Sequence, residues 1–435
     1  MKYLIKTWGC QMNALDSDKM AGILQGLGYE ATENEREADV ILLNTCSVRE
    51  GPENKVFTEL GRLKSLKKEK AVILGLVGCV AQQEKAEVFK RAPFVDLVMG
   101  PRGLKHLPEL LLQARYQHAM DTVFHEDSIL FPDQAIARSH RTKAYITVME
   151  GCNKQCSFCI VPATRGREVY RPLQSIVEEA RRAVESGYIE VELLGQNVNC
   201  WKDDTHGFAD LLAAVSDLPG VKRLRFTTSH PRHFPLAAAD LMAERDNLCP
   251  YLHLPVQAGS DAILKAMRRQ YDKAWYLNLV EEIRARVPEI AFSTDVIVGF
   301  PGETEEDFEH TLDVVRRVEY DTLFSFRFSP RPGTPAEGMD PVPEAVARER
   351  HQRLLDTQLD IQTRRFAAAV GRTVEVLVEG GSKKGGQFMG RSPDNKVVNF
   401  TSDTPVAIAD LVPVRITHSH INSLLGVCVS SPVLR

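Results

Sequence analysis

The chain has 435 residues, of which 43% are hydrophobic and 26% are charged, and its net charge is −4. This length exceeds what one compact core supports and predicts two or three domains. With a slightly negative net charge, the chain lacks the overall basic character that is typical of nucleic-acid-binding proteins. Any RNA contact therefore has to come from local basic patches. The longest apolar run, residues 71–80, is far short of the roughly 18 residues that a membrane span needs, and no signal peptide opens the chain. We therefore expect a soluble, cytoplasmic protein.

Residues 1–118 alternate between apolar strands and helices. The expected strands are KYLIKTW, ADVILLN, AVILGLV and DLVMG. Near-continuous apolar strands that alternate with helices predict a parallel sheet covered on both faces. Three of these strands run directly into Cys10, Cys46 and Cys79, which we call the strand triad. Because the carboxyl ends of parallel strands share one edge, we expect these thiols to meet and to form a metal site. The alternative is that each cysteine is a small buried apolar residue.

The remainder of the chain divides into a linker and two further domains. Residues 119–142 show little periodicity and are expected to form the linker. Residues 143–370 repeat strand and helix six times, which predicts a partial (β/α)6 barrel with its working face at the carboxyl ends of the strands. Residues 371–435 contain short alternating strands broken by Gly, Pro, Asn and Asp, which predict a small antiparallel β-barrel.

Three of the nine cysteines, Cys152, Cys156 and Cys159, follow the first barrel strand with the spacing C-x3-C-x2-C; we call them the loop triad. An odd number of cysteines in a cytoplasmic chain argues against a disulfide framework and for thiolate chemistry. Structural zinc needs a fourth ligand, and the next forty or so residues offer only Cys200. A four-iron cluster on three thiolates keeps one iron without a protein ligand, which is typical of a reactive metal site.

These features carry a resemblance to a known family. The loop triad after the first strand of a partial barrel resembles the radical S-adenosylmethionine superfamily. The N-terminal domain with its strand triad, together with a terminal barrel similar to a TRAM domain, resembles the methylthiotransferases of that superfamily. The resemblance covers essentially all 435 residues and rests on TWGCQMNALDSDKM, LLNTCSVRE, MEGCNKQCSFCIVPATRGREV, LLGQNVN, RFTTSHP, HLPVQAGSD, VIVGFPGET and SPRPGTPA.

The resemblance implies two 4Fe-4S clusters and S-adenosylmethionine as cofactors. The loop triad would hold the cluster whose open iron chelates S-adenosylmethionine and whose electron cleaves it to a 5′-deoxyadenosyl radical. The strand triad would hold an auxiliary cluster that carries or activates the sulfur to be inserted. One molecule of S-adenosylmethionine methylates the sulfur, and a second makes the radical. The carbon–hydrogen bond that reacts has no useful acidity, so no general acid or base is named.

Within the family, LLGQNVN at residues 193–199 favours the branch that acts on N6-isopentenyl-adenosine at position 37 of tRNA and converts adenine C2–H to C2–SCH3. One alternative is the same chemistry on threonylcarbamoyl-adenosine in tRNA or on a ribosomal-protein aspartate. An alternative from another class is a non-catalytic iron–sulfur RNA-binding protein. Tyr170 and Ala14 depart from the family pattern, which has a small residue and an acidic residue there, and they bear on fine substrate contacts.

Polar residues at the ends of the barrel strands are candidates for binding S-adenosylmethionine. They are Gln196, Asn197, Gln257 and Gly299, with Ser229 and His230 at the end of the third strand as further candidates. The alternative for each is ordinary turn chemistry.

The resemblance implies that the terminal barrel holds the anticodon stem-loop of tRNA. The basic candidates there are Lys383, Lys384, Arg391 and Lys396, interleaved with Phe388 and Phe400; the alternative is a solvated loop with two core phenylalanines. Arg165, Arg167, Arg268 and Arg269 are further candidates for the RNA footprint. An electron donor of the flavodoxin or ferredoxin type and a sulfur source complete the expected partners, and the chain is expected to act as a monomer.

Overall fold

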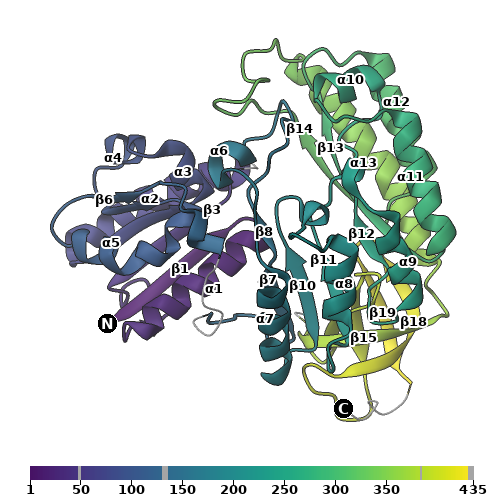
Figure 1. Cartoon of the computed structure of the whole chain (residues 1–435), viewed down its shortest axis with the longest axis horizontal. Helices are drawn as coiled ribbons and strands as arrows, with labels where there is room; N and C mark the ends of the chain where they lie inside the picture. Colours follow the sequence, from purple (N-terminus) through teal and green to yellow (C-terminus); the bar gives the residue numbers. More distant parts are fainter. Residues whose placement is uncertain (48–49, 130–135, 383–384, 430–435) are drawn as a thin grey trace.

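The computed structural model describes residues 1–47, 50–129, 136–382 and 385–429, which form three parts (Figure 1). The N-terminal part is a sheet with the strand order β2-β1-β3-β4-β5-β6. Its strands are β1 (Lys2–Trp8), β2 (Glu30–Ala31), β3 (Val40–Thr45), β4 (Ile73–Gly78), β5 (Leu97–Met99) and β6 (Ala119–Asp121). Every neighbouring pair is parallel, as the sequence predicts.

Helices cover both faces of this sheet. They are α1 (Gln11–Gly26), α2 (Glu50–Glu69), α3 (Cys79–Glu84), α4 (Glu87–Arg91), the 3-10 helix η1 (Pro101–His106) and α5 (Leu107–Gln113). Successive residues of β3 point to opposite faces, so Leu42 joins the core that includes Leu24 of α1, whereas Leu43 joins the core that includes Leu60 of α2. The run of apolar residues in β3 therefore reflects burial on both faces.

Two short edge strands, β2 and β6, were not predicted. β6 takes up residues 119–121, the first residues of the expected linker, and pairs with β5. A strand of three residues shows no alternation in its sequence and is recognisable only from its pairing partner. The connection to the barrel that follows β6 includes, in its described residues, the 3-10 helix η2 (Glu126–Ile129).

The central part is the predicted partial barrel of six parallel strands. They are β7 (Lys143–Thr147), β10 (Glu190–Leu194), β11 (Arg223–Phe226), β12 (Tyr251–His253), β13 (Ala291–Val298) and β14 (Thr322–Arg327). They form two three-stranded sheets, β11-β10-β7 and β12-β13-β14. A parallel bridge between Leu224 and Leu248 links the two halves.

Helices pack along the outside of this barrel (Figure 1). They are α7 (Leu173–Glu185), α8 (Phe208–Ser216), α9 (Leu236–Glu244), α10 (Asp261–Ala266), α11 (Lys273–Arg286), α12 (Glu305–Val318) and α13 (Glu344–Ala367), with the short η4 (Val198–Cys200) and η5 (Pro231–His233). The predicted capping box opens α12, because Thr304 and Asp307 bond each other's backbone N–H. In the described part of the chain, no helix is both long and apolar enough to cross a membrane.

The C-terminal part is a closed five-stranded barrel, as predicted. Its strands are β15 (Thr373–Gly381), β16 (Phe388–Arg391), β17 (Val397–Thr401), β18 (Leu411–His420) and β19 (Ser423–Cys428). The pairing differs from an all-antiparallel barrel in one place, since β17 and β19 are parallel. Arg223 and Arg225 of β11 attach this barrel to the central one: Arg223 donates to the carbonyl of Arg391 at 2.6 Å, and Arg225 donates to that of Ser392 at 2.9 Å.

Candidate functional site

A cavity of about 1680 Å³ lies between the inside of the central barrel and the N-terminal sheet. It is larger than the roughly 300–1,000 Å³ of an ordinary small-molecule site, so it has room for more than one ligand. All three cysteines of the loop triad line it, together with Cys10 and Cys46 of the strand triad. Barrel residues such as Tyr145, Glu192 and Phe324 form its wall. The two triads therefore border one reaction space.

The strand triad meets at the carboxyl edge of the N-terminal sheet. Cys10 precedes α1, Cys46 follows β3, and Cys79 begins α3 directly after β4. A hydrogen bond from the Cys46 thiol lowers the pKa of Cys10 to about 6 and that of Cys79 to about 7. Because Cys46 shares its one S–H proton with both neighbours, its own pKa is raised. Thiolate character at neutral pH is what metal binding requires, because the thiolate is the ligand.

Arg165 reaches the strand triad from the central barrel. It is the last residue of α6 (Val161–Arg165), which packs against α3, and it donates to Asp16 at 2.6 Å with both side chains buried. After the hydrogen bond from Cys46, the charge of Arg165 further lowers the pKa of Cys10 and of Cys79. In the described residues, Arg165 Nη1 has no hydrogen-bond partner. The prediction that Arg165 belongs to an RNA footprint is wrong, because its side chain is buried beside the cysteines.

The loop triad is held by a glycine and a short hairpin. The strands β8 (Met149–Glu150) and β9 (Val169–Tyr170) pair on either side of the loop. Gly151 between them has φ +79°, and a Cβ there would lie 2.1 Å from the carbonyl oxygen of Arg167. Only glycine fits this position. The next residue, Cys152, donates its N–H to the carbonyl of Gly166 at 3.0 Å, which fixes the start of the loop.

Burial dominates the electrostatics of the loop triad. It raises the pKa of Cys152 to about 11 and that of Cys159 to about 12. Desolvation disfavours the charged thiolate, so without a metal these two side chains are neutral thiols. A bound metal would have to displace the protons, and metal binding at this loop is therefore coupled to proton release.

Arg269 is the positive charge next to the loop triad. Its Nη1 donates to Cys156 Sγ at 3.4 Å, its Nη2 to the Pro255 carbonyl at 2.9 Å, and its Nε to the Tyr271 hydroxyl at 2.9 Å. The prediction of RNA contact is wrong for Arg269, because it is buried and bound to a cysteine. The neighbouring Arg268 is exposed.

The spacing of the loop triad fits an iron–sulfur cluster better than a single ion, and the strand triad offers the same number of thiols. In a tetrahedral zinc site, thiolate sulfurs lie about 3.8 Å apart. Over the residues that the structure describes, the loop triad does not bring its three sulfurs within 4.8 Å of one another, whereas Cys46 already contacts both other thiols of the strand triad. A four-iron cluster binds each thiolate at a different iron and so requires wider spacing. Arg165 and Arg269 place positive charge beside the two sets of cysteines, where it would favour anionic thiolates.

Three of the four residues named for S-adenosylmethionine line the cavity: Gln196, Asn197 and Gln257. Gln196 Oε1 accepts the N–H of Gly151 at 2.5 Å, so this side chain also supports the cysteine loop. In the described residues, Asn197 Oδ1 is buried without a hydrogen-bond partner. Gln257 lies four residues beyond the end of β12, forms an isolated bridge with Val296, and has φ +73°. These side chains sit where a polar ligand beside the loop triad would meet them.

Gly299, the fourth candidate for S-adenosylmethionine, is not among the described residues that line the cavity. Its N–H donates to Glu303 Oε2 at 2.8 Å, and its φ is +69°. A Cβ at this position would lie 2.8 Å from the side chain of Ala347, so the glycine serves a tight turn against α13.

Ser229 and His230 also line the cavity. Ser229 Oγ and His230 Nδ1 are buried and have no hydrogen-bond partner in the described residues. Burial, followed by the charge of Arg269, lowers the pKa of His230 to about 2, so its imidazole is neutral. Both side chains therefore offer unused polar atoms to a ligand.

The four basic residues named on the terminal barrel occupy different environments. Lys383 and Lys384 lie outside the described residues. Arg391 lines the cavity and donates to the Asn395 carbonyl at 3.1 Å. Lys396 is 8% exposed, and its ammonium pairs with Asp394 and, at 2.9 Å, with Asp321 of the central barrel. Because both carboxylates pair with its ammonium, Lys396 helps to attach the terminal barrel to the central barrel.

The two departures from the family pattern both lie close to the site. The Tyr170 hydroxyl donates to Glu168 at 2.6 Å, and Glu168 in turn accepts the N–H of Asn153 at 3.2 Å. Tyr170 thus helps to hold the loop triad in place. Ala14 lines the cavity from α1.

Comparison with known families agrees with this architecture. The model described as "Uncharacterized protein family UPF0004" matches residues 2–100, that of the radical SAM superfamily matches residues 146–315, and that of the TRAM domain matches residues 367–429. Among solved structures, the radical S-adenosylmethionine methyltransferase TsrM from Kitasatospora setae superposes with a TM-score of 0.56 at 18% identity over 77% of each chain. That structure contains cobalamin and a 4Fe-4S cluster, and the likeness shows a shared fold.

Curated relatives match along the whole chain. A tRNA-2-methylthio-N(6)-dimethylallyladenosine synthase from Carboxydothermus hydrogenoformans is 45% identical, over 98% of this chain and 99% of the relative. The synthase of the same name from Aquifex aeolicus is 43% identical over 98% of both chains. The chain therefore belongs to the tRNA-2-methylthio-N(6)-dimethylallyladenosine synthase family of radical S-adenosylmethionine enzymes, whose cofactors are S-adenosylmethionine and 4Fe-4S clusters.

Proposed function

We propose that this chain is a transferase that converts the adenine C2–H of N6-isopentenyl-adenosine at position 37 of tRNA to C2–SCH3. The observation that carries the proposal is the shared cavity, in a chain that is 45% identical over its full length to a synthase of that product. A reaction that joins sulfur to an unactivated carbon requires both reactants in one space, and thiols of both triads border that space.

The cysteines are the residues that hold the cofactors. The loop triad would bind a 4Fe-4S cluster with one iron open to S-adenosylmethionine, and the strand triad would bind a second cluster. When bound, these groups supply the electron, the radical and the sulfur, which amino acid side chains cannot supply. Arg269 and Arg165 stabilise the anionic ligands, and Gly151 with Gln196 keeps the loop in its binding conformation.

Unused polar atoms in the cavity suit the polar groups of S-adenosylmethionine. Asn197, Ser229 and His230 each present a buried atom without a partner in the described residues. Buried polar atoms are almost always paired in folded proteins, so three orphans on one wall point to a missing polar ligand. Gln257 lies on the same wall and completes this set.

The tRNA enters where the terminal and central barrels meet. Arg391 lines the cavity there, and Arg331 lines it beyond the carboxyl end of β14, so both place positive charge along the path of the RNA backbone. The target adenine is splayed out of the anticodon loop, because a base inside a stacked loop does not reach a buried cavity. Lys383 and Lys384 stay candidates for RNA contact from the sequence and lie outside the described residues.

The remaining partners follow from the chemistry. An electron donor of the flavodoxin or ferredoxin type reduces the loop-triad cluster, and a separate donor replaces the sulfur consumed in each turnover. The chain acts as a monomer in the cytoplasm, since one chain carries both triads, the barrel and the RNA-binding domain.

The test is a comparison of substrates under anaerobic conditions. Protein loaded with iron and sulfide is incubated with reductant, S-adenosylmethionine and a tRNA that carries N6-isopentenyl-adenosine, and the nucleosides are analysed by mass spectrometry. We expect one methylthio group on that adenine.

Matched reactions contain a threonylcarbamoyl-adenosine tRNA or a ribosomal protein. A product on either of these, with none on the isopentenyl tRNA, contradicts the proposed substrate. Absence of 5′-deoxyadenosine in every reaction contradicts the reaction class and favours the non-catalytic RNA-binding alternative.

A further inference from the structure

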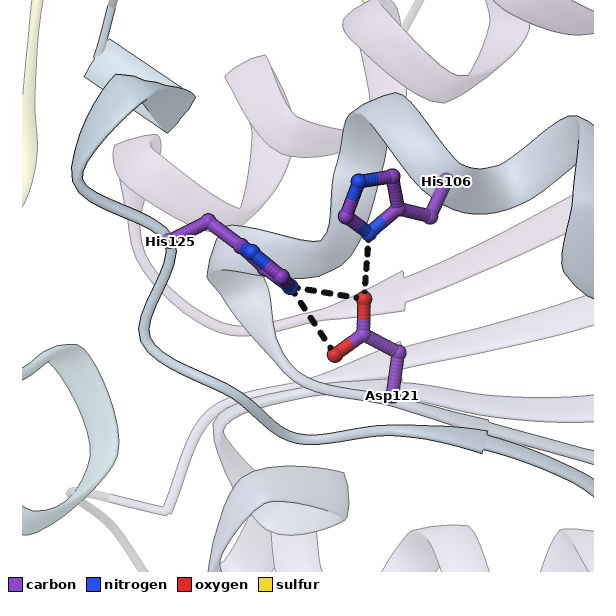
Figure 2. A group of neighbouring side chains, drawn as sticks. All are labelled: His106, Asp121 and His125. Carbon is purple, nitrogen blue, oxygen red and sulfur yellow. Dashed lines mark hydrogen bonds and ion pairs between the residues drawn. The ribbon is translucent and has the colours of Figure 1, made fainter.

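Two histidines and an aspartate converge on the N-terminal domain, apart from both cysteine triads (Figure 2). His106 ends η1, Asp121 ends β6, and His125 follows four residues later. His106 Nδ1 lies 2.7 Å from Asp121 Oδ2, and His125 Nε2 lies 3.0 Å from the same oxygen and 3.1 Å from Oδ1. Figure 2 shows both rings turned toward the oxygens of the carboxylate, His106 from a helix and His125 from a loop.

The geometry of this group is that of a mononuclear metal site. Its three ligand atoms all lie within 4.8 Å of one another. Nitrogen and oxygen ligands of a tetrahedral zinc ion lie about 3.3 Å apart, given bonds of about 2.0–2.1 Å. The two observed separations from Oδ2, 2.7 and 3.0 Å, need to widen by only a few tenths of an ångström. The imidazoles meet edge to face, with centroids 4.3 Å apart and an interplanar angle of 89°, so neither blocks the other's nitrogen.

The carboxylate is anchored, whereas the histidines are accessible. Asp121 lies on a paired strand, accepts the N–H of Val123 at 3.0 Å through Oδ1, and has a side chain that is 10% exposed. The side chains of His106 and His125 are 47% and 26% exposed. The adjacent Lys105 is paired with Asp127 at 2.9 Å and is therefore not directed at Asp121. An ion thus has a fixed ligand and a path from solvent.

We propose that His106, Asp121 and His125 bind one divalent transition-metal ion of the zinc type, with water at the remaining coordination position. Two imidazoles and one carboxylate suit zinc and its neighbours, whereas magnesium and calcium prefer oxygen ligands alone. None of the three residues lines the cavity, so this ion would be distinct from both clusters.

The ion would act as a structural clamp. It joins η1 and the end of β6 to the connection that leads to the barrel. Arg102 in the same η1 donates to the Arg167 carbonyl at 2.6 Å, in the segment that follows the loop triad. Fixing η1 therefore steadies one of the contacts between the N-terminal domain and the cysteine loop.

The test counts zinc in protein whose clusters are already loaded, because free cluster cysteines would themselves bind zinc. The loaded protein is equilibrated with Zn²⁺, desalted, and analysed for zinc and iron. We expect one zinc per chain. His106→Asn and His125→Asn should each lower the affinity for zinc by at least about tenfold, because even residues that only hydrogen-bond to a metal ligand have an effect of that size. His118→Asn is the matched control, since His118 is an exposed histidine of the same domain that stacks on Phe89. It should bind zinc like the wild type.

Two results would overturn the proposal. One is loaded wild-type protein that retains no more zinc than the His125→Asn variant, which would mean that the group is held by imidazole-to-carboxylate hydrogen bonds alone. The other is a ¹¹³Cd NMR signal in the thiolate range instead of the nitrogen and oxygen range, which would place the ion on cysteine. Equal iron content in all variants serves as the check on folding.

Discussion

The loop triad comes from one segment of eight residues, whereas the strand triad comes from three strands that lie more than thirty residues apart in sequence. Their electrostatics differ as much as their construction. Burial raises the pKa of Cys152 to about 11 and that of Cys159 to about 12, whereas a hydrogen bond from Cys46 lowers the pKa of two strand thiols to about 6 and 7. The loop can be positioned by local backbone geometry, but the strand triad exists only once the whole parallel sheet has formed.

Each triad also receives an arginine from a distant part of the fold. Arg269, near α10, donates directly to Cys156 of the loop triad. Arg165, which belongs to the loop-triad side, acts on the strand triad and is balanced by Asp16. A residue of the central domain therefore lowers the pKa of thiols in the N-terminal domain, and the two groups of cysteines are electrostatically linked across the domain contact.

The largest effect is expected from a change in the loop triad, which should stop both S-adenosylmethionine cleavage and tRNA modification. Cys156→Ala removes a ligand of the loop triad, so 5′-deoxyadenosine formation should fall to the limit of detection and no modified tRNA should form. Product analysis by mass spectrometry measures both. Cys200→Ala is the matched control, because Cys200 is half-buried near the same loop and is assigned no ligand role. Full activity of the Cys156 variant would exclude the loop triad as the site of S-adenosylmethionine cleavage.

Cys46→Ala removes a thiol of the strand triad and leaves the loop triad intact. It should abolish the methylthio product and leave 5′-deoxyadenosine formation in place, because the loop triad stays intact. Cys249→Ala, a buried barrel cysteine, is the control. If deoxyadenosine also disappears while the iron of the loop triad is still present, the two sites are not functionally separable.

Arg269→Met is expected to shift the reduction potential of the loop-triad cluster to more negative values. The guanidinium stabilises the added electron, and loss of a tenfold factor in a one-electron equilibrium corresponds to about 60 mV. Redox titration followed by EPR measures the shift. Arg268→Met, one residue away and exposed, should leave the potential unchanged. Equal shifts in both variants would show a general charge effect and would contradict the specific role of the Arg269 hydrogen bond.

A smaller effect is expected at the strand triad. Arg165→Met combined with Asp16→Asn removes the pair without leaving a buried charge uncompensated. The arginine favours the thiolates, so its loss should raise the pKa of Cys10 and Cys79 above about 6 and 7 and move their alkylation to higher pH. The measurement is peptide-resolved alkylation of iron-free protein across a pH series. Arg167→Met is the exposed control. An unchanged pH profile would mean that the hydrogen bond from Cys46 alone sets these pKa values.

The sequence predicted those parts of the site that are encoded locally or by simple topology. Spacing identified the loop triad, and the rule that parallel strands end at one edge brought Cys10, Cys46 and Cys79 together. The roles of Arg165, Arg269 and Lys396 were not predictable in this way. Each was interpreted as a surface cation, whereas burial and a partner more than seventy residues away decide what it does. Patterns of charge in sequence do not reveal such pairings, because they depend on how the domains pack.

Edge elements set a similar limit on predicting the fold. β6 shows no pattern of its own and forms by pairing with β5. It also carries Asp121, so the group that this residue forms with His106 and His125 could not be recognised before the strand was placed. Lys143 and Arg225 pair with Glu190 at 3.0 and 3.2 Å; Lys143 lies opposite Glu190 in the strand register and Arg225 lies diagonally to it, so these pairings also follow from the placed strands.

The most direct test of the account is a count of iron in variants that lack one whole triad. Wild-type protein reconstituted without oxygen should contain about eight iron atoms, four for each cluster. The variant with all three loop cysteines replaced by alanine should retain about four, and so should the variant without the three strand cysteines. EPR of the reduced samples should show a different spectrum for each. If either variant loses all of its iron, or if the wild type contains only about four, the two triads do not hold two independent clusters and the account is contradicted.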